Sequence, residues 1–226
     1  MMAETSVIRL SARLQAAAAL IPQCSTLFDI GTDHAYLPIY CIQTNRCQHA
    51  VASDRREGPL RRATEHIKRY QLAELITTRL ADGLSGLNPQ ADDTVVICGL
   101  GGVEMQRILS AGGPVSGTLI LQPQKDIRLL RHWLADHGYV FESEYLAEDR
   151  NRYYPVMRVR HDGKQHQLTE LEAQVGPCLI RTHTPALRCY ISRELGKLNK
   201  QLTGTPELGP LIDLLNQLME DNEYVS

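Results

Sequence analysis

The sequence lacks long apolar segments, secretion signals and the cysteine spacings of metal sites. Its 226 residues contain no run of about 18 apolar residues, so no ordinary transmembrane helix and no membrane partner is expected. Arg9, Arg13 and Gln15 interrupt the first apolar stretch, and we therefore expect no secretory signal peptide and a cytoplasmic location. The six cysteines form no C-x-x-C pair and no metal-ligand spacing with histidine, which predicts reduced thiols and no bound metal.

A strong charge of either sign is also missing. The formal net charge is −2, so the whole chain is not a general polyanion binder, and any nucleic-acid contact must come from local patches. Internal repeats and low-complexity tracts are absent from the sequence. Hydrophobic residues make up 43% of the chain, which is enough for the core of one domain with an appendage.

Short apolar runs alternate with helical patterns through the first two thirds of the chain. Strands are predicted at Thr26–Ile30, Ala50–Ser53, Thr77–Ala81, Thr94–Cys98 and Thr118–Gln122. Helices are predicted at Leu37–Gln43, Pro59–Tyr70, Val103–Ala111 and Asp126–His137. This alternation indicates βαβ units, and therefore an α/β fold with a parallel sheet that helices cover on both faces.

The pattern then changes to strict alternation of apolar and polar residues. Tyr139–Leu146 and Tyr154–Arg160 both follow it, and the segment between them is too short for a crossover helix. We therefore predict an antiparallel pair. Dinucleotide dehydrogenases usually continue with another parallel strand. Parallel strands closed by an antiparallel hairpin instead resemble the Rossmann-like sheet of class I methyltransferases, which use S-adenosylmethionine.

The last third of the chain shows apolar residues at helical spacing. One stripe comprises Leu168, Leu171, Val175 and Leu179, and a second comprises Leu187, Ile191, Leu195, Leu198 and Leu202. The two stripes predict a C-terminal α-helical hairpin whose helices pair with each other. Pro177 conflicts with the first stripe, because proline interrupts a helix interior. A last short helix is expected at about Leu208–Met219.

The loop in "LFDIGTDHAYLP", after the first predicted strand, is unusual for a nucleotide-binding turn. Gly31 permits a tight turn, but Asp33 and Ala35 occupy positions where the dinucleotide fingerprint has glycine. S-adenosylmethionine has no pyrophosphate, so a loop that binds it needs fewer glycines. Asp33 could accept hydrogen bonds from the amino group of that cofactor, or from a donor of the protein that lies behind the ligand contacts.

The next three strand ends also carry residues suited to a ligand, which in open α/β sheets binds beyond the carboxyl ends of the strands. Asp54 could accept hydrogen bonds from ribose hydroxyls, or could cap a helix or a turn. The resemblance to class I methyltransferases implies an adenine contact at Asp82 and Gly83, and the alternative is an ordinary β-turn. Three glycines in "CGLGG" indicate backbone that a ligand approaches closely, although such turns are common: Gly99, Gly101 and Gly102.

These motifs in this order resemble the bacterial tRNA adenine-22 N1-methyltransferase family, over about Leu10 to Arg160. The carrying stretches are "LSARLQAAAALIP", "DIGTDHAYLP", "SDRREGPL", "ADGL", "CGLGG" and "LQPQ". The resemblance implies a methyltransferase domain at 1–163 and a coiled-coil-like helical extension at 164–226. This chain departs from the family in having Leu100 where methionine is common and Gln124 where asparagine is common.

The resemblance also implies roles for individual residues. It implies that S-adenosylmethionine binds to Asp29, Gly31, Asp54, Asp82, Gly83 and Gly99. It implies a catalytic, substrate-facing set near Asp33, His34, Tyr36, Gly101, Gly102 and Gln122. The reaction would be methylation of N1 of an adenine, at position 22, in tRNA.

N1 carries no proton, so a general base is not needed, and His34 is expected to be structural, bonded to a neighbouring strand. Asp33 could accept from N6–H of the adenine and stabilise the charge that develops on the ring, or it could orient the cofactor or cap the next helix. A base extruded from the tRNA would stack on an aromatic ring, and the candidates are Tyr36, Tyr153 and Tyr154.

Positive clusters could bind the phosphate backbone, although each could equally be a solvated helix face. The residues expected to bind RNA are Arg55, Arg152, Arg181, Arg188, Arg193 and Lys197. Residues 201–226 contain acids and no Lys or Arg and should avoid tRNA. Alternatives are a class I methyltransferase for another RNA, protein or small molecule, a non-catalytic S-adenosylmethionine-binding module, and a nucleotide-linked oxidoreductase. A monomer is slightly favoured.

Overall fold

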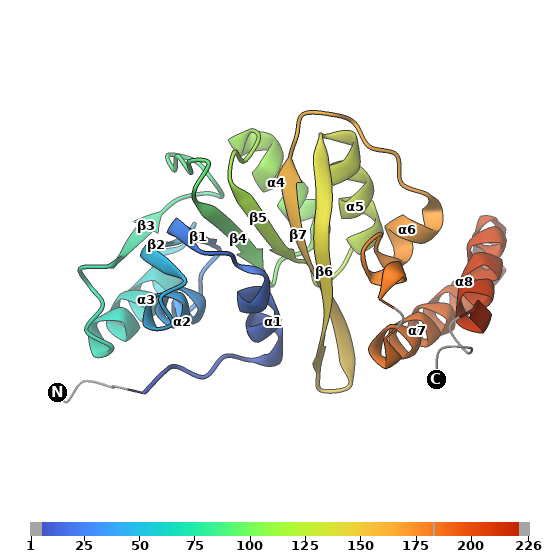
Figure 1. The fold of residues 1–226 in the computed structure, drawn as a ribbon, viewed down its shortest axis with the longest axis horizontal. Coiled ribbons are helices and arrows are strands. Elements are labelled where there is room, and N and C mark those ends of the chain that lie inside the picture. Colours follow the sequence, from blue (N-terminus) through green and yellow to red (C-terminus); the bar gives the residue numbers. More distant parts are fainter. Residues whose placement is uncertain (1–5, 183, 222–226) are drawn as a thin grey trace.

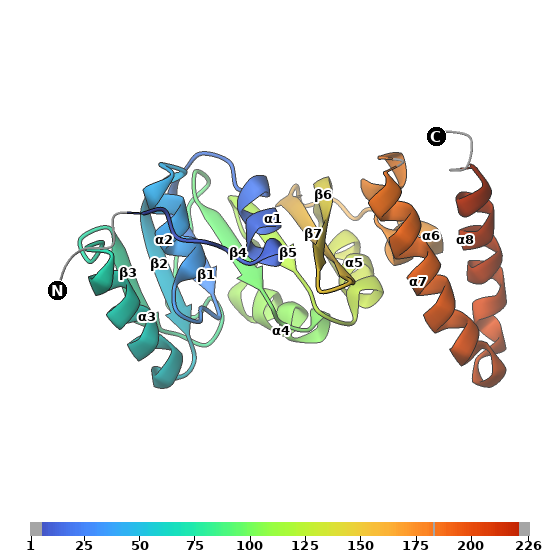
Figure 2. The same ribbon diagram turned by 90° about the horizontal axis from the view of Figure 1, so that it is seen from below.

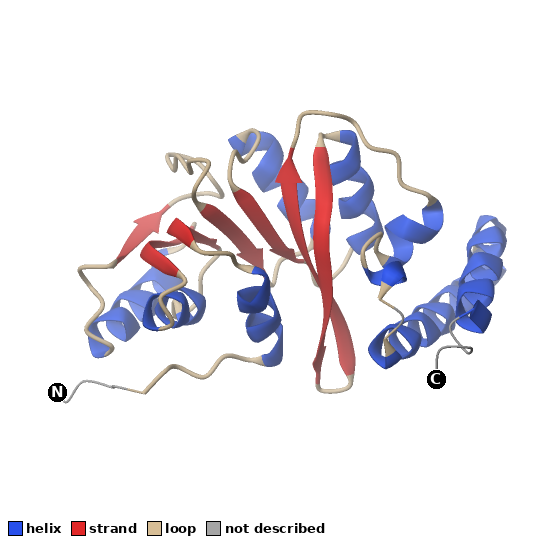
Figure 3. Ribbon diagram, viewed as in Figure 1, coloured by secondary structure: helices blue, strands red, loops and turns tan. Residues whose placement is uncertain are grey.

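The computed structural model describes residues 6–182 and 184–221 as a layered α/β fold with a helical tail (Figures 1 and 3). The strands are β1 Cys24–Ile30, β2 Cys47–Asp54, β3 Ile76–Leu80, β4 Thr94–Cys98, β5 Thr118–Gln122, β6 Tyr139–Asp149 and β7 Arg152–His161. The helices are α1 Ala12–Leu20, α2 Tyr36–Gln43, α3 Glu57–Arg69, α4 Gly102–Gly112, α5 Ile127–Asp136, α6 Glu170–Val175, α7 Pro185–Gln201 and α8 Gly209–Asp221. Short 3-10 turns lie at η1 Leu179–Arg181, η2 Leu202–Gly204 and η3 Pro206–Leu208.

The seven strands form one sheet in the order β3-β2-β1-β4-β5-β7-β6. The first five are parallel to one another, and β7 pairs antiparallel with both β5 and β6. The order reverses at β1 and β4, so their carboxyl ends define the crevice in which such sheets bind ligands. The predicted Rossmann-like sheet and its closing hairpin are confirmed.

Alternate side chains of the central strands enter two separate cores. Leu27 and Val96 pack with α1, α2 and α3 on one face, whereas Phe28 and Val95 pack with α4 and α5 on the other. Figure 1 shows α1, α2 and α3 below the sheet and α4 and α5 above it. Because both faces are buried, the strands read in sequence as continuous apolar runs.

The hairpin between β6 and β7 is longer than its alternating pattern predicted. Only Arg150 and Asn151 form the turn, and both have positive φ angles, 48° and 58°. A two-residue turn of this kind matches the twist of antiparallel strands. Most of the expected connecting segment is therefore strand.

Helix α1 has no counterpart among the predicted elements. It is rich in alanine, and Ser11 caps it by accepting a hydrogen bond from the Leu14 N–H. Helix α1 packs on β6 and β7, which places Arg13 near the carboxyl ends of the strands.

The expected pairing of the two apolar stripes in the tail is wrong. The first stripe forms only α6, which ends at Gly176 with φ 126°, and Pro177 follows. The helical hairpin instead joins α7 to α8, which lie side by side at one end of the molecule (Figure 2). Gly176 and Pro177 together end the first helix. The apolar residues of α6 therefore pack against the α7–α8 hairpin instead of forming one half of it.

A buried ion pair attaches the tail to the sheet. Arg131 of α5 donates through Nε to Oε1 of Glu144 on β6 at 3.0 Å, and both side chains are fully buried. Arg131 also donates to the carbonyls of Ala173 and Gln174, while Oε2 of Glu144 accepts from the Cys178 N–H. The division at residues 163 and 164 stays a prediction, but the two parts share this charged contact.

Across residues 6–182 and 184–221, none of the helices combines the length and the apolar content needed to span a membrane.

Candidate functional site

The carboxyl ends of β1, β2, β4 and β5 surround two adjoining cavities. One has a volume of about 370 Å³ and is lined by Asp29, Gly31, Gly99 and Gln122, among others. The second has a volume of about 180 Å³ and is lined by Asp54, Asp82 and Gly83, among others. Gly31 and Leu100 line both, so the cavities form two compartments of one site.

The larger cavity brings together three of the six residues predicted to be catalytic and substrate-facing. Asp33, Tyr36 and Gln122 all line it, and Gln122 is buried at its base. Tyr36 is exposed at the start of α2, and its ring contacts His34 and His66.

Asp29 is the most perturbed carboxyl group of the site. It is the penultimate residue of β1 and is buried, and this desolvation raises its pKa to about 6 against an opposing hydrogen bond with Thr32. The nearby charge of Asp54 raises it further. A positively charged ligand in the cavity would lower the pKa of Asp29 again, because an opposite charge favours the ionised carboxylate.

Asp54 ends β2 in the smaller cavity. Its Oδ1 accepts from the Arg56 N–H at 2.8 Å, so the turn role anticipated as an alternative is present. Among the described residues, no hydrogen bond reaches Oδ2, which leaves an acceptor for a ligand. Asp54 does not cap α3, because the residue at that helix start is Arg56.

Asp82 and Gly83 form the opposite side of the smaller cavity. Gly83 has φ 62°, as expected for the turn, and a Cβ there would lie 3.0 Å from Ile108. Arg107 donates to both carboxylate oxygens of Asp82, with the shorter distance 2.6 Å. These hydrogen bonds lower the pKa of Asp82 and hold its side chain at the exposed rim.

Asp33 lies at the opening of the larger cavity and does not cap a helix. Helix α2 begins after Ala35, which has a left-handed backbone and no side-chain cap. Asp33 Oδ1 instead accepts from Arg62 Nη2 of α3 at 2.7 Å. Of the three roles considered for Asp33, capping is therefore wrong, and contacts to the cofactor or to the target base stay predictions.

His34 is held by a helix and not by the neighbouring strand that was expected. Its carbonyl accepts from His66 Nδ1 of α3 at 2.8 Å, and its φ of 66° is positive. His34 is absent from the lining of both cavities, which agrees with a structural role.

The glycines of "CGLGG" are present for two different structural reasons. Gly99 has φ 81° and faces the larger cavity. A Cβ on Gly102 would lie 2.4 Å from the Asp126 carbonyl oxygen, and one on Gly101 would lie 2.9 Å from Lys125. Close packing of α4 against the backbone before α5 therefore accounts for Gly102, whereas at Gly101 the flexible Lys125 side chain can move aside. The substrate-facing role of both glycines stays a prediction.

The residues expected to bind RNA occupy different places. Arg55 lines the smaller cavity, with Nη1 3.7 Å from Glu104. Arg152, Arg193 and Lys197 line a separate cavity of about 380 Å³ between β7 and α7. Arg181 and Arg188 lie outside that cavity, at η1 and on α7.

Three arginines of the site were not among the predicted cofactor-binding or catalytic residues, although Arg62 belongs to a positive cluster that the sequence shows. Arg13 lines the larger cavity, and Arg62 and Arg107 hold Asp33 and Asp82. Each comes from a helix whose local sequence gives no sign of which strand end it faces. Only Arg107 had a local signal, a carboxylate at helical spacing in Glu104.

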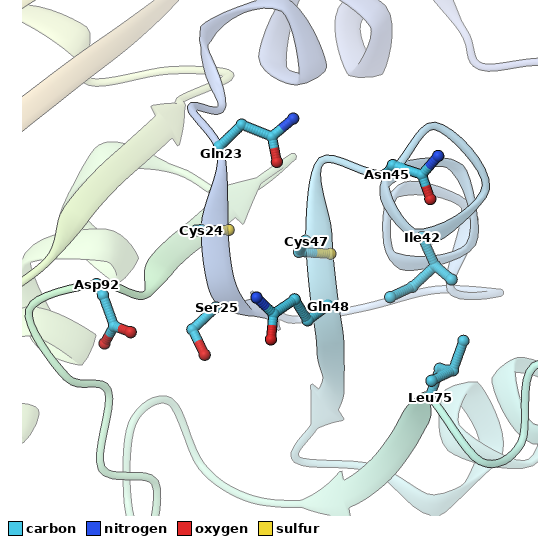
Figure 4. A pocket seen from close by; sticks show the side chains of 9 residues that line it. All are labelled: Gln23, Cys24, Ser25, Ile42, Asn45, Cys47, Gln48, Leu75 and Asp92. Atoms are coloured by element: carbon cyan, nitrogen blue, oxygen red, sulfur yellow. The ribbon is translucent and has the colours of Figure 1, made fainter.

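A larger hollow lies at the opposite end of the strands. Its volume is about 680 Å³, and Cys24 and Cys47 lie at its centre in neighbouring register positions of β1 and β2 (Figure 4). It is at the amino ends of the strands, away from the carboxylates described above. Within the described parts of the chain, no cluster of His, Cys, Asp and Glu could hold a metal ion.

The residues that line the two compartments fit S-adenosylmethionine in their chemistry. The backbone turns at Gly31, Gly83 and Gly99 all have positive φ, which leaves room beside the strand ends for a ligand. Carboxylates of Asp29 and Asp54 lie in separate compartments, which suits a ligand with a cationic end and a ribose. Asp54, Asp82 and Gly83 would hold the nucleoside part, and Asp29 and Gly99 the amino-acid part.

Comparison with known proteins finds tRNA methyltransferases among the similar sequences. A curated Bacillus subtilis protein named tRNA (adenine(22)-N(1))-methyltransferase is 34% identical over 153 residues, which cover 66% of this chain and 64% of that protein. The match thus spans less than two thirds of that relative.

Two solved structures match almost the whole chain. A Streptococcus pneumoniae protein in complex with S-adenosyl-L-methionine is 30% identical, with a TM-score of 0.84 over 93% of this chain and 100% of the other. Mycoplasma capricolum TrmK, in complex with the cofactor product S-adenosyl-homocysteine, is 27% identical, with a TM-score of 0.78 over 96% and 99% of the two chains. The model of the tRNA (adenine(22)-N(1))-methyltransferase family matches residues 27–215. The chain therefore belongs to the tRNA (adenine(22)-N(1))-methyltransferase family.

Proposed function

We propose that this protein transfers a methyl group from S-adenosylmethionine to N1 of adenine 22 in tRNA, in the cytoplasm. The observation that carries the proposal is the pair of joined cavities at the strand ends, with Asp29 and Asp33 in one and Asp54 and Asp82 in the other. Family membership supports the target atom and position.

When bound, S-adenosylmethionine supplies an electrophilic methyl group on a positively charged sulfur. The protein has to position the reactants and exclude water. Correct orientation of two reactants can lower an activation barrier by up to about 7–11 kcal/mol. The free oxygen of Asp54 would accept from ribose hydroxyls. The buried carboxylate of Asp29 would balance the positive charge of the cofactor.

The opening of the larger cavity suits an adenine base. Tyr36 is exposed there and offers a ring for stacking, as enzymes that extrude bases require. Asp33 could accept from N6–H, and a fixed negative charge at that position would stabilise the cationic ring that N1 methylation produces. Arg62 orients Asp33 through the 2.7 Å contact.

The test is incubation of the protein with labelled S-adenosylmethionine and unmodified bulk tRNA, followed by nucleoside analysis. We expect label in N1-methyladenosine, and much less label with Asp54→Ala when S-adenosylmethionine is below the concentration that saturates this variant. Label in another nucleoside, or in protein, would favour a class I methyltransferase with a different substrate. Calorimetry with S-adenosylmethionine and NAD completes the test: binding of the first without any methyl transfer would indicate a non-catalytic module, and binding of NAD alone an oxidoreductase.

A further inference from the structure

A cleft of about 380 Å³ separates the sheet from the helical tail. Arg152, Tyr153 and Tyr154 line it from β7, while Arg193 and Lys197 line it from α7. Gln124, in the loop after β5, also lines it, as do Tyr190 and Glu194 of α7. The cleft thus combines aromatic rings and cations from both parts of the molecule with one carboxylate.

The cleft adjoins the larger cavity of the proposed active site. Gln124 lines both spaces. The guanidinium carbon of Arg13, which lines the active-site cavity, lies 5.1 Å from the ring centroid of Tyr154, which lines the cleft. A substrate chain that places one base in the active site could therefore continue directly into the cleft.

The contacts inside the cleft prepare a flat surface. The guanidinium of Arg193 lies 4.8 Å from the ring centroid of Tyr153, and Arg193 also donates to the Asn151 carbonyl in the hairpin turn. This interaction holds the tyrosine ring and the arginine guanidinium together. Unpaired bases stack on both kinds of group. Arg152 is exposed beside them, and Lys197 is mostly exposed although it contacts Glu194 at 2.6 Å.

The two sides of the cleft are held in a fixed relation. The fully buried Arg131 and Glu144 connect α5 and β6 to the chain that leads into α7. Leu146 of β6 packs in the same apolar cluster as Leu187 and Ile191 of α7. The cleft is therefore a built feature of the fold and not a gap between loosely tethered parts.

We infer that this cleft binds the nucleotide next to the target adenine in tRNA, with its base stacked on the Tyr153–Arg193 pair and its phosphate near Arg152 and Lys197. The inference rests on the proposed function, because it names the part of the substrate that lies beside the methylated base. When a base leaves a helix, each neighbouring base loses a stacking partner, and an aromatic surface beside the active site can replace that lost stacking. An acidic peptide would use the cations but not the paired rings.

The test combines a protein variant with a change in the RNA. Substrate tRNAs carry an abasic nucleotide immediately 5′ or 3′ of the target adenine, or at a distant position as a control. For the wild-type protein, one of the two adjacent abasic sites should lower kcat/KM roughly tenfold, within the range for loss of one base–aromatic stack. Tyr153→Ala should show a similar loss on intact tRNA and no further loss on that abasic tRNA.

The matched control is Tyr145→Ala, at an exposed tyrosine on β6 that lines neither cavity. It should leave kcat/KM on intact tRNA and the effect of the abasic site unchanged. Affinity for S-adenosylmethionine should be the same in all variants, since Tyr153 lies outside the cofactor cavities. If Tyr153→Ala fails to fold, Tyr153→Leu, which keeps apolar volume but no flat ring, takes its place.

The inference is overturned if neither adjacent abasic site lowers wild-type kcat/KM, or if the losses from protein and RNA multiply independently. A wild-type protein that methylates no adenine N1 at all would instead refute the proposed function. The two failures are therefore distinguishable.

Discussion

At Asp29 the structure places a carboxyl group where it is costly without a ligand. Its pKa is raised to about 6 because burial desolvates the charge. A bound cation reverses the effect, because it favours the ionised form. The proposed role of Asp29 is thus to bind a positively charged ligand, and not to stabilise the fold.

Cofactor affinity should consequently depend on pH near this value. As pH falls through about 6, Asp29 becomes protonated in the free protein, and affinity for S-adenosylmethionine should fall, by up to about tenfold per pH unit. Calorimetry between pH 4.5 and 7.5 measures the effect. Asp29→Asn should bind more weakly at neutral pH and lose this dependence; an unchanged pH profile in that variant would show that another group titrates.

Asp54 offers a second test at the residue scale, because one oxygen accepts from the Arg56 N–H and the other is left for the ligand. Asp54→Asn can keep the acceptor for the Arg56 N–H and loses the charge of the free oxygen, whereas Asp54→Ala loses both. We expect about 10–100-fold weaker cofactor binding in both variants, from hydrogen bonds to a charged group worth about 1.5–3 kcal/mol. Asp92→Ala, at an exposed loop, is the control. Near-normal affinity of Asp54→Asn would mean that the turn, and not the ribose contact, is what Asp54 provides.

At the scale of elements, the strands were predictable and the tail was not. A strand buried on both faces is a run of apolar residues, so Thr94–Cys98 and Thr118–Gln122 were found with their observed bounds. Apolar spacing in the tail could not identify which helices pair, because apolar residues of α6, α7 and α8 all enter one cluster. Gly176 and Pro177 end α6, and α8 then packs against α7 to form the hairpin.

The site shows the same division between local and distant information. Residues at strand ends, such as Asp29 and Gly99, are placed by the sheet itself, so their positions followed from the sequence. Arg13, Arg62 and Arg107 reach the site from helices, and their partners depend on packing that no local pattern encodes.

Gly102 tests the packing explanation of the glycine motif. Gly102→Ala would place a Cβ 2.4 Å from the Asp126 carbonyl oxygen, so α4 or α5 must shift. We expect a loss of about 1–3 kcal/mol in the free energy of unfolding, as for other overpacked sites, measured by urea denaturation.

Gly196→Ala is its matched control, because nothing lies within 4 Å of the added Cβ in the middle of α7. That change should stabilise the protein by about 0.5–1 kcal/mol through helix propensity. A neutral Gly102→Ala variant with reduced cofactor affinity would instead restore the ligand-approach interpretation.

At the scale of the whole molecule, the buried ion pair joins the sheet to the tail. Glu144→Gln leaves Arg131 charged and buried with only carbonyl partners, and removal of one partner of a buried pair typically costs about 3–5 kcal/mol. Urea denaturation should show this loss in one transition. Replacing both residues, as Arg131→Met with Glu144→Leu, should cost much less; an equal cost would show that the stabilisation comes from the individual hydrogen bonds to the tail and not from charge pairing.

The most direct measurement of the central claim uses two tRNA transcripts that differ only at position 22. One carries adenine there and the other guanine, and both are incubated with the protein and S-adenosylmethionine. Because N1 methylation blocks base pairing, reverse transcription reveals the modified position as a stop. The account predicts a stop at position 22 in the adenine transcript and none in the guanine transcript. Equal methylation of both transcripts, or a stop elsewhere, would contradict it.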